Sequence, residues 1–161
     1  MAKTYGQTCP VALTLEIIGE RWTLLIIREL FRHRSQRFQD LQETLVGVAP
    51  NVLSDRLKTL EEHGLIQREF YSKHPPRAAY ALTPVGRDLQ ATMRSLAVWG
   101  AKHLGGEVRV LHEACGHGVE MRTYCPHCET QLANDAVRIN WPEDLRELQQ
   151  AAAGTSRRRA R

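Results

Sequence analysis

Three cysteines and two of the three histidines within residues 112–128 have the types and spacing that bind a metal ion. Cys125 and Cys128 form a C-x-x-C turn, which lets two thiolates bind one tetrahedral ion. Cys115 would supply a third thiolate, and His117 or His112 would supply the imidazole of a Cys₃His site. Four protein ligands leave no position open for water, so we expect the cofactor to be a structural Zn²⁺ ion.

Two other interpretations of these cysteines stay open. The thiols could remain free in a small hairpin that folds without metal, or Cys125 and Cys128 could form a redox pair. A structural disulfide is disfavoured, because the cytoplasm keeps thiols reduced. The signal is moderate in strength, since Cys115 and His117 form a C-x-H pair rather than a second C-x-x-C turn.

Cys9 is a candidate redox sensor of a different kind. It stands immediately before Pro10, at or next to the N-terminus of a predicted helix. A helix N-terminus stabilises a thiolate and favours its reaction with oxidants. Oxidation beside a dimer interface would shift that interface and change the affinity for a ligand. The alternative is a small, partly buried cysteine without a chemical role.

The stretch from Pro50 to Gly64 predicts a helix with one polar face. Pro50 suits the first helical position, and Gly64 suits a left-handed helix end. Leucines spaced i, i+4, i+7 form an apolar stripe that should face a core. The opposite face carries the candidates for contact with DNA bases: Asn51, Ser54, Asp55 and Lys58. Arg56 lies on the flank between the two faces, where it could reach a phosphate or a neighbouring carboxylate. An ordinary solvated helix is the alternative interpretation.

A hairpin with a basic loop is predicted directly after this helix. Residues 65–72 and 78–83 alternate roughly between apolar and polar, as half-buried strands do. The loop between them holds two prolines and several donors, among them Lys73 and Arg77. Such a loop can lie along a duplex and place Arg77 in or near the minor groove. Helix and hairpin together form the layout of a winged helix, an α+β and mainly helical fold.

Further helices must position this unit. We predict helices over 10–18, 21–31 and 38–45, and the second is apolar nearly all round, so it should be the buried centre. Thr83 and Pro84 begin one long helix, as N-cap and first-position proline, which runs towards His103. This helix carries more apolar surface than a small domain can cover.

The chain from residue 9 to 104 resembles the HxlR family of bacterial regulators, which are relatives of the MarR-type winged helices. The matching landmarks follow one another in order: Cys9-Pro10, Ile18-Gly19, Trp22-Thr23, Arg37-Phe38, Leu53-Ser54, Arg56-Leu57, Gly64-Leu65, Pro75-Pro76-Arg77 and Tyr80. The resemblance implies a homodimer, joined through the first and the long helix, that binds double-stranded operator DNA and usually represses. Some relatives sense quinones, aldehydes or oxidants through a cysteine that matches Cys9.

The chain departs from the resembled family just before the polar helix. The family often has Ser where Ala49 stands. Loss of a side-chain N-cap costs on the order of 1 kcal/mol of helix stability. Asp55 is a second unusual residue on a face meant for DNA, since it can accept from a cytosine amino group but is repelled by phosphate.

Composition bounds the remaining possibilities. The 161 residues predict a winged-helix and dimerisation domain (1–104), a zinc-ribbon-like appendage (105–140), and a short helix with a disordered basic tail (141–161). Residues 1–104 hold 14 Lys or Arg against 10 Asp or Glu, which suits a basic patch. Neither a leader nor a membrane span of ~20 apolar residues is recognisable, so we expect a cytoplasmic protein.

Catalysis is not expected from this sequence. It contains no P-loop, dinucleotide-binding glycine motif, nucleophile elbow or H-E-x-x-H motif. A different class stays open, because winged helices also serve as protein-interaction modules. In that case Arg56, Lys58 and Arg77 would have no partner phosphate. As a DNA-binding regulator, the protein should respond to a small-molecule or redox effector that the sequence does not specify.

Overall fold

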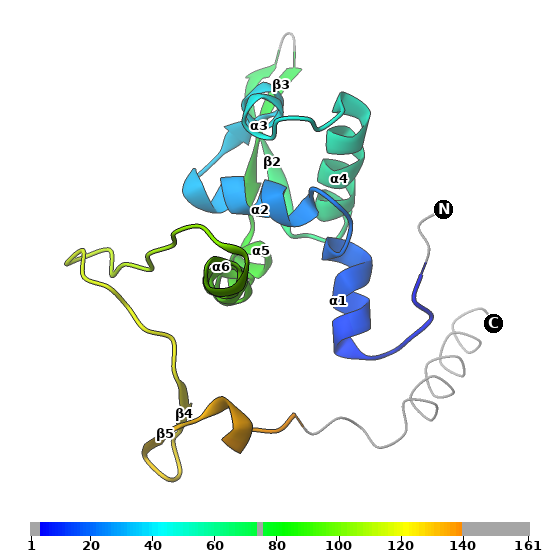
Figure 1. Ribbon diagram of the computed structural model, residues 1–161. Helices are drawn as coiled ribbons and strands as arrows, with labels where there is room; N and C mark the ends of the chain where they lie inside the picture. The colour runs from blue at the N-terminus through cyan, green and yellow to red at the C-terminus, as the bar shows by residue number, and fades with distance from the viewer. Residues whose placement is uncertain (1–3, 74–75, 140–161) are drawn as a thin grey trace.

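The computed structural model describes residues 4–73 and 76–139. The helices are α1 (Pro10–Ile18), α2 (Thr23–Arg32), α3 (Phe38–Thr44), α4 (Pro50–Glu62), α5 (Pro84–Asp88) and α6 (Gln90–Leu104), and a 3₁₀ turn, η1, spans Asn134–Ala136 (Figure 1). The strands are β1 (Gln36–Arg37), β2 (Ile66–Lys73), β3 (Pro76–Leu82), β4 (Thr123–Cys125) and β5 (Thr130–Leu132). The predicted α+β, mainly helical winged-helix fold is confirmed. The helix and tail predicted for 141–161 lie outside the described residues.

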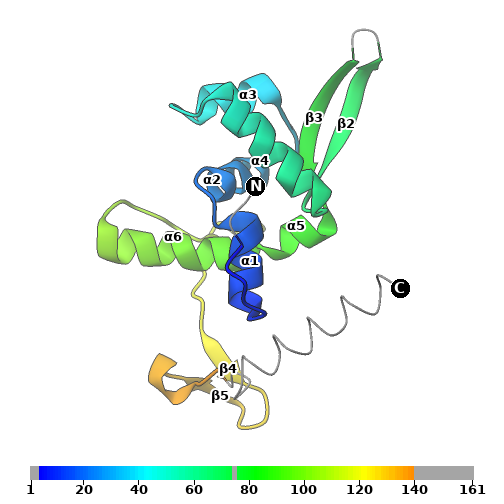
Figure 2. The ribbon, with the colours of Figure 1, turned by 90° about the vertical axis from the view of Figure 1, so that its right-hand side faces the viewer.

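A three-stranded antiparallel sheet carries the wing. Its strand order is β1-β3-β2, and Tyr80 of β3 pairs with Gln36 on one side and Arg68 on the other. An irregularity between Phe70 and Ser72 shifts the register near the wing tip. Figure 2 shows the β2–β3 hairpin projecting beyond the helices. The sequence pattern did not predict β1, because two residues are too short for any period.

The core lies between α2, α3, α4 and the base of the sheet. Leu53, Leu57 and Leu60 are at most 1% exposed, which confirms the predicted apolar stripe of α4. They pack in one cluster with Ile26 and Leu41, both fully buried. The spacing of the leucines therefore fixes which face of α4 is turned outward.

Helix α2 differs from its prediction in start and burial. Trp22 has φ +80°, a left-handed conformation that ends any helix before it, so α2 begins at Thr23 rather than at Arg21. The helix is not buried all round, because Leu25 is 37% exposed. Its inner face holds the fully buried carboxylate of Glu29, which pairs with two arginines of the same helix.

The predicted long helix after the wing is divided in two. Thr83 is its N-cap, as expected, and its hydroxyl accepts a hydrogen bond from the Gly86 N–H. The chain then tightens at Leu89, whose N–H bonds to the Gly86 carbonyl three residues earlier, and α6 starts at Gln90. Periodicity alone did not predict this break, since the residues on both sides favour a helix.

Both predicted strands of the hairpin are confirmed, as β2 and β3, but fully buried residues occur only at its base. Ile66, Ala81 and Leu82 are buried there, but Gln67 to Tyr71 are all exposed. Ser72 and Ala78 to Tyr80 are half-buried, so the outer half of the hairpin has no fully buried side chain among those that the structure describes. Residues 105–139 are likewise mostly exposed, and their regular structure is the β4–β5 hairpin with η1. Within the part of the chain that the structure describes, no helix is long and apolar enough to cross a membrane.

Candidate nucleic-acid interface

The outward face of α4 is polar along its whole length. Asn51, Ser54, Asp55 and Lys58 are all exposed, as the sequence predicts. The helix begins at Pro50, and Ala49 provides no side-chain cap. The free N–H groups of the first turn are therefore available to an anion such as a phosphate.

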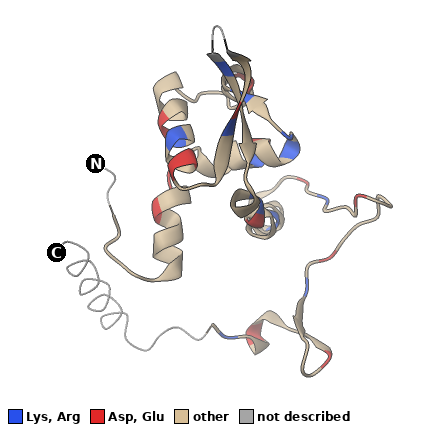
Figure 3. Ribbon diagram, turned by 180° about the vertical axis from the view of Figure 1, so that it is seen from behind, with Lys and Arg blue, Asp and Glu red and all other residues tan. Residues whose placement is uncertain are grey.

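The charge on this face is nearly balanced. Lys58 Nζ lies 3.8 Å from the Glu62 carboxylate one turn later, and Asp55 lies on the same face. Figure 3 shows acidic and basic positions mixed along α4. Hydrogen bonds rather than net charge must therefore dominate any reading of bases by this helix.

Arg56 is turned towards the protein. Its side chain is only 25% exposed, and Nη1 lies 3.9 Å from Glu20 Oε2 in the turn after α1. Its Nε is buried without a hydrogen-bond partner. The sequence left a phosphate and a neighbouring carboxylate open as partners, and the structure places the carboxylate beside it. Contact with DNA would need a new rotamer.

The wing supplies an exposed cation beside α4. Lys73 ends β2, with its backbone opposite Pro76, and Arg77 is exposed opposite Ser72. The loop residues His74 and Pro75 lie outside the described residues. Helix and wing thus project from the same end of the domain (Figure 2).

Two further arginines belong to this surface: Arg37, which the sequence places in a turn where a phosphate could sit, and Arg68, which sequence reasoning missed. The Arg37 guanidinium lies 4.8 Å from the Tyr71 ring centroid, which ties the start of α3 to the wing. Arg68 binds Glu61 of α4 at 2.6 Å and stacks over Tyr80. Both contacts join segments far apart in the chain, so no local pattern could indicate them.

The predicted metal ligands form two separate pairs. His112 Nδ1 lies 3.0 Å from Cys115 Sγ in a tight turn, whereas His117 holds that turn through its carbonyl oxygen, which accepts from the His112 N–H. The second pair, Cys125 and Cys128, closes the β4–β5 hairpin (Figure 1). Within residues 4–73 and 76–139, no three His, Cys, Asp or Glu side chains gather closely enough to hold one metal ion.

The C-x-x-C turn is arranged to favour a thiolate. The Cys128 backbone N–H, the His127 backbone N–H and the Cys128 thiol all hydrogen-bond to Cys125, and these bonds lower the pKa of the Cys125 thiol. Glu129 follows the turn with φ +50°, and Gly116 follows Cys115 with φ +69°. In both turns, the residue after the last cysteine, Cys115 or Cys128, therefore has a left-handed backbone conformation.

Cys9 is the N-cap residue of α1. Its thiol is half-buried, and its carbonyl oxygen accepts from the Leu13 N–H at 3.0 Å. Neighbouring Thr8 has a buried hydroxyl without a partner. The structure thus confirms that Cys9 lies at the N-terminus of a helix.

The family follows from residues 17–107, which match the profile of the HxlR-like helix-turn-helix family over more than half of the chain. The chain belongs to this family. The match covers α2 to α6, including the polar helix and the wing. The prediction of a DNA-binding, helix-turn-helix transcriptional regulator of the HxlR family is therefore confirmed.

Individual relatives extend the similarity beyond the family profile. The HTH-type transcriptional regulator Rv3095 of Mycobacterium tuberculosis is 41% identical over 126 residues, which cover 76% of this chain and 78% of that protein. The solved structure of PA1607 superimposes with a TM-score of 0.70 at 30% identity, over 85% of this chain and 96% of that one. The redox regulator HypR, solved in its oxidised form, covers 62% of this HxlR-family chain and all of its own, with a TM-score of 0.55 and 29% identity.

Proposed function

We propose that this HxlR-family regulator represses transcription as a homodimer that places α4 in the major groove of operator DNA. The observation that carries the proposal is the exposed polar face of α4 beside a projecting, arginine-bearing wing. Asn51 and Ser54 lie at the start of the helix, where recognition helices contact base edges. Arg77 and Lys73 of the wing contact the flanking backbone or minor groove. The protein acts by binding, not by catalysis.

The dimer joins two copies through α1 and α6. Both helices lie at the end of the domain away from the wing (Figure 2). They expose large apolar side chains that a single chain leaves in water: Val11, Leu13, Leu15, Trp99 and Leu104. Covering this surface with a second copy stabilises both subunits. The two α4 helices then read half-sites separated by about one DNA turn, ~34 Å.

Redox control through Cys9 is the regulatory part of the proposal. Cys9 begins α1, one of the two helices assigned to the dimer interface. The similar structure of HypR is that of a redox regulator. Oxidation of Cys9 would alter the packing of α1 and with it the spacing of the recognition helices.

A structural Zn²⁺ ion in the appendage, residues 105–139, hereafter the extension, is the second regulatory or structural part of the proposal. The donor types suit zinc, and each of the two turns brings two donors together, His112 with Cys115 and Cys125 with Cys128. Of the two candidate histidines, His112 has a ring nitrogen beside a thiol. A four-ligand site requires the two turns to meet, either within one chain or between two copies. Zinc bound at the site would brace the extension.

The main proposal is tested by DNA binding. Fluorescence anisotropy measures, across a salt series, the affinity of the protein for fragments from upstream of candidate target genes. Reduced protein should bind one fragment far more tightly than bulk DNA, and log affinity should fall linearly with log salt. Peroxide should release DNA from the native protein but not from Cys9→Ser. Equal binding to every fragment would contradict repression at an operator and favour a protein-interaction module.

The oligomeric state and the metal content are measured on the same preparation. Light scattering after size exclusion should give the mass of two chains, and mass spectrometry of metals about one zinc per chain. Cys125→Ser should lose the zinc. A mass of one chain would refute the homodimer. Protein that contains no zinc and keeps its structure with all thiols reduced would refute the structural zinc.

A further inference from the structure

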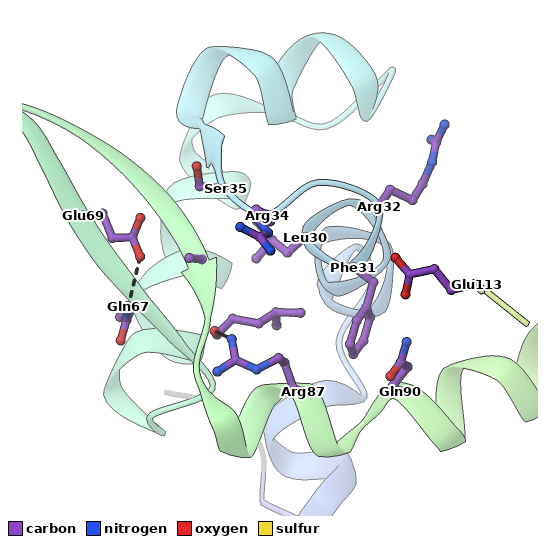
Figure 4. Close-up of a pocket in the computed structure, with 12 residues that line it drawn as sticks. Leu30, Phe31, Arg32, Arg34, Ser35, Gln67, Glu69, Arg87, Gln90 and Glu113 are labelled. Carbon is purple, nitrogen blue, oxygen red and sulfur yellow. Dashed lines mark hydrogen bonds between the residues drawn. The ribbon is translucent and has the colours of Figure 1, made fainter.

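Two neighbouring hollows border α2 on the side away from α4. The first, about 820 Å³, lies between α2, the base of the wing sheet and the start of α6, and is polar (Figure 4). The second, about 540 Å³, lies between α2 and α6. They share Phe31, Arg32 and Gln90 as walls, so they meet beside the end of α2.

The hollow between α2 and α6 has an apolar floor. Six of its lining residues are apolar and come from both helices: Leu24, Leu25, Phe31, Met93, Leu96 and Ala97. Its volume falls within the roughly 300–1,000 Å³ range of pockets that bind small molecules. An apolar body with one or two rings would fit the size and the chemistry of this floor.

Positive charge borders the same hollow. Arg28, Arg32 and Arg94 line it, and no Asp or Glu does. The fully buried carboxylate of Glu29 pairs with Arg28 at 2.7 Å and with Arg32 at 3.1 Å, so it is shared by two of the three guanidinium groups. Arg94 is exposed and makes no ion pair with any described residue. A guanidinium is always charged and binds carboxylates and sulfonates with paired N–H donors.

The polar hollow is the weaker candidate of the two. Its lining holds both signs of charge, since Glu69 and Glu113 line it together with Arg32 and Arg34. Arg87 there is already occupied, because Nη1 donates to the Leu82 carbonyl at 2.6 Å. Figure 4 shows Arg34 and Arg87 on the side of the wing sheet and Glu113 on the far side of Phe31. Charge there is nearly balanced and selects no particular ligand.

We propose that the hollow between α2 and α6 binds a small amphipathic organic anion, with an aromatic or branched aliphatic body and one carboxylate or sulfonate. The body lies on the apolar floor, and the anionic group binds Arg94 together with Arg28 or Arg32. This ligand is the effector of the proposed regulator, and to that extent the inference depends on the proposed function. α2 packs against β3 of the wing sheet, and α6 is a dimer helix, so a ligand between them changes the separation of the two α4 helices.

The probe that tests this inference is 8-anilinonaphthalene-1-sulfonate, an aromatic anion that fluoresces when it leaves water. Titration into the full-length dimer should saturate at one site per chain. Arg94→Gln should weaken binding about tenfold, the loss expected for one charge-assisted contact. Arg109→Gln, an exposed arginine of the extension, is the matched control and should not change the affinity. N-phenyl-1-naphthylamine, the same body without the sulfonate, should bind more weakly by a similar factor.

The inference would be overturned by the absence of saturable binding, by equal loss of affinity in both arginine variants, or by equal affinity for the neutral probe. A fluorescence signal that follows the monomer fraction during dilution would also overturn it, because a partner helix would then fill the hollow. The DNA-binding measurement is separate. Probe binding without operator binding rejects the proposed function alone, and operator binding without probe binding rejects only this inference.

Discussion

The Thr83 hydroxyl oxygen lies 2.6 Å from the carbonyl oxygen of Gly64, to which it donates a hydrogen bond. The same oxygen accepts from the Gly86 N–H at 3.1 Å. One side chain thus joins the end of α4 to the start of α5. The Thr83 N–H adds a further bond to the Leu65 carbonyl at 3.0 Å, so this one residue helps to set the direction in which α5 leaves the end of α4.

Replacing Thr83 by Val should destabilise the protein. The variant keeps the shape but loses both the cap and the donor, so the free energy of unfolding should fall by about 1–2 kcal/mol. Urea denaturation followed by circular dichroism, at fixed protein concentration, measures the change. Thr83→Ser retains the hydroxyl and should lose much less. Equal loss in both variants would assign the effect to packing of the methyl group.

Gly86 is expected to tolerate no side chain. A Cβ built at this position would lie 2.0 Å from the Leu65 carbonyl oxygen, and backbone must shift to relieve that contact. Gly86→Ala should therefore cost more than about 2 kcal/mol of stability. Gly118→Ala is the control, since its Cβ would have no atom within 4 Å, and it should change stability by less than about 0.5 kcal/mol. Similar denaturation midpoints for the two variants would reject the close approach.

The buried carboxylate of Glu29 should matter more than exposed ones. Substitution by Gln leaves Arg28 and Arg32 without their charged partner and adds amide donors that face guanidinium donors. The free energy of unfolding should fall by about 2 kcal/mol. Glu43→Gln, at an exposed position of α3, should have an effect below about 0.5 kcal/mol. Thermal-shift measurements compare the melting temperatures of the two variants. Equal melting temperatures would contradict a structural role for the Glu29 carboxylate.

Loss of the wing arginine should weaken DNA binding without affecting the fold. Arg77→Ala removes one phosphate-neutralising charge, so affinity should drop several-fold at physiological salt and the salt slope should decrease by about one. Anisotropy titrations at four salt concentrations measure both quantities. Arg138→Ala, an exposed arginine of the extension, should behave as the native protein does. Unchanged affinity for Arg77→Ala would refute the wing contact.

Cys125 should react with alkylating agents at lower pH than an ordinary thiol. Hydrogen bonds from Cys128 and His127 lower the pKa of its thiol, so its reactive thiolate persists as pH falls below the ordinary range. In reduced protein freed of metal by a chelator, the alkylation rate of Cys125 should therefore reach half its maximum at a lower pH than that of N-acetylcysteine. Peptide mapping by mass spectrometry gives the site-specific rate. Coincident pH profiles would contradict the prediction.

Local sequence determined the polar face of α4 and its two ends. Leu53, Leu57 and Leu60 recur with the helical period, so one face had to be buried and the opposite one exposed. Gly64 takes the left-handed conformation, φ +69°, that a helix end requires and that glycine alone adopts without strain. Thr83 caps the helix that follows it for an equally local reason. These features depend on neighbours within one or two turns.

Only the tertiary structure decided which distant groups meet. The pairing of β1 with β3, the contact of Arg37 with Tyr71 and the turn of Arg56 towards Glu20 join residues with no shared period. The hollow between α2 and α6 likewise arises where two helices fail to close over each other. Such contacts depend on how whole elements pack, and packing is set by the sum of many side chains, so no single stretch of sequence specifies it.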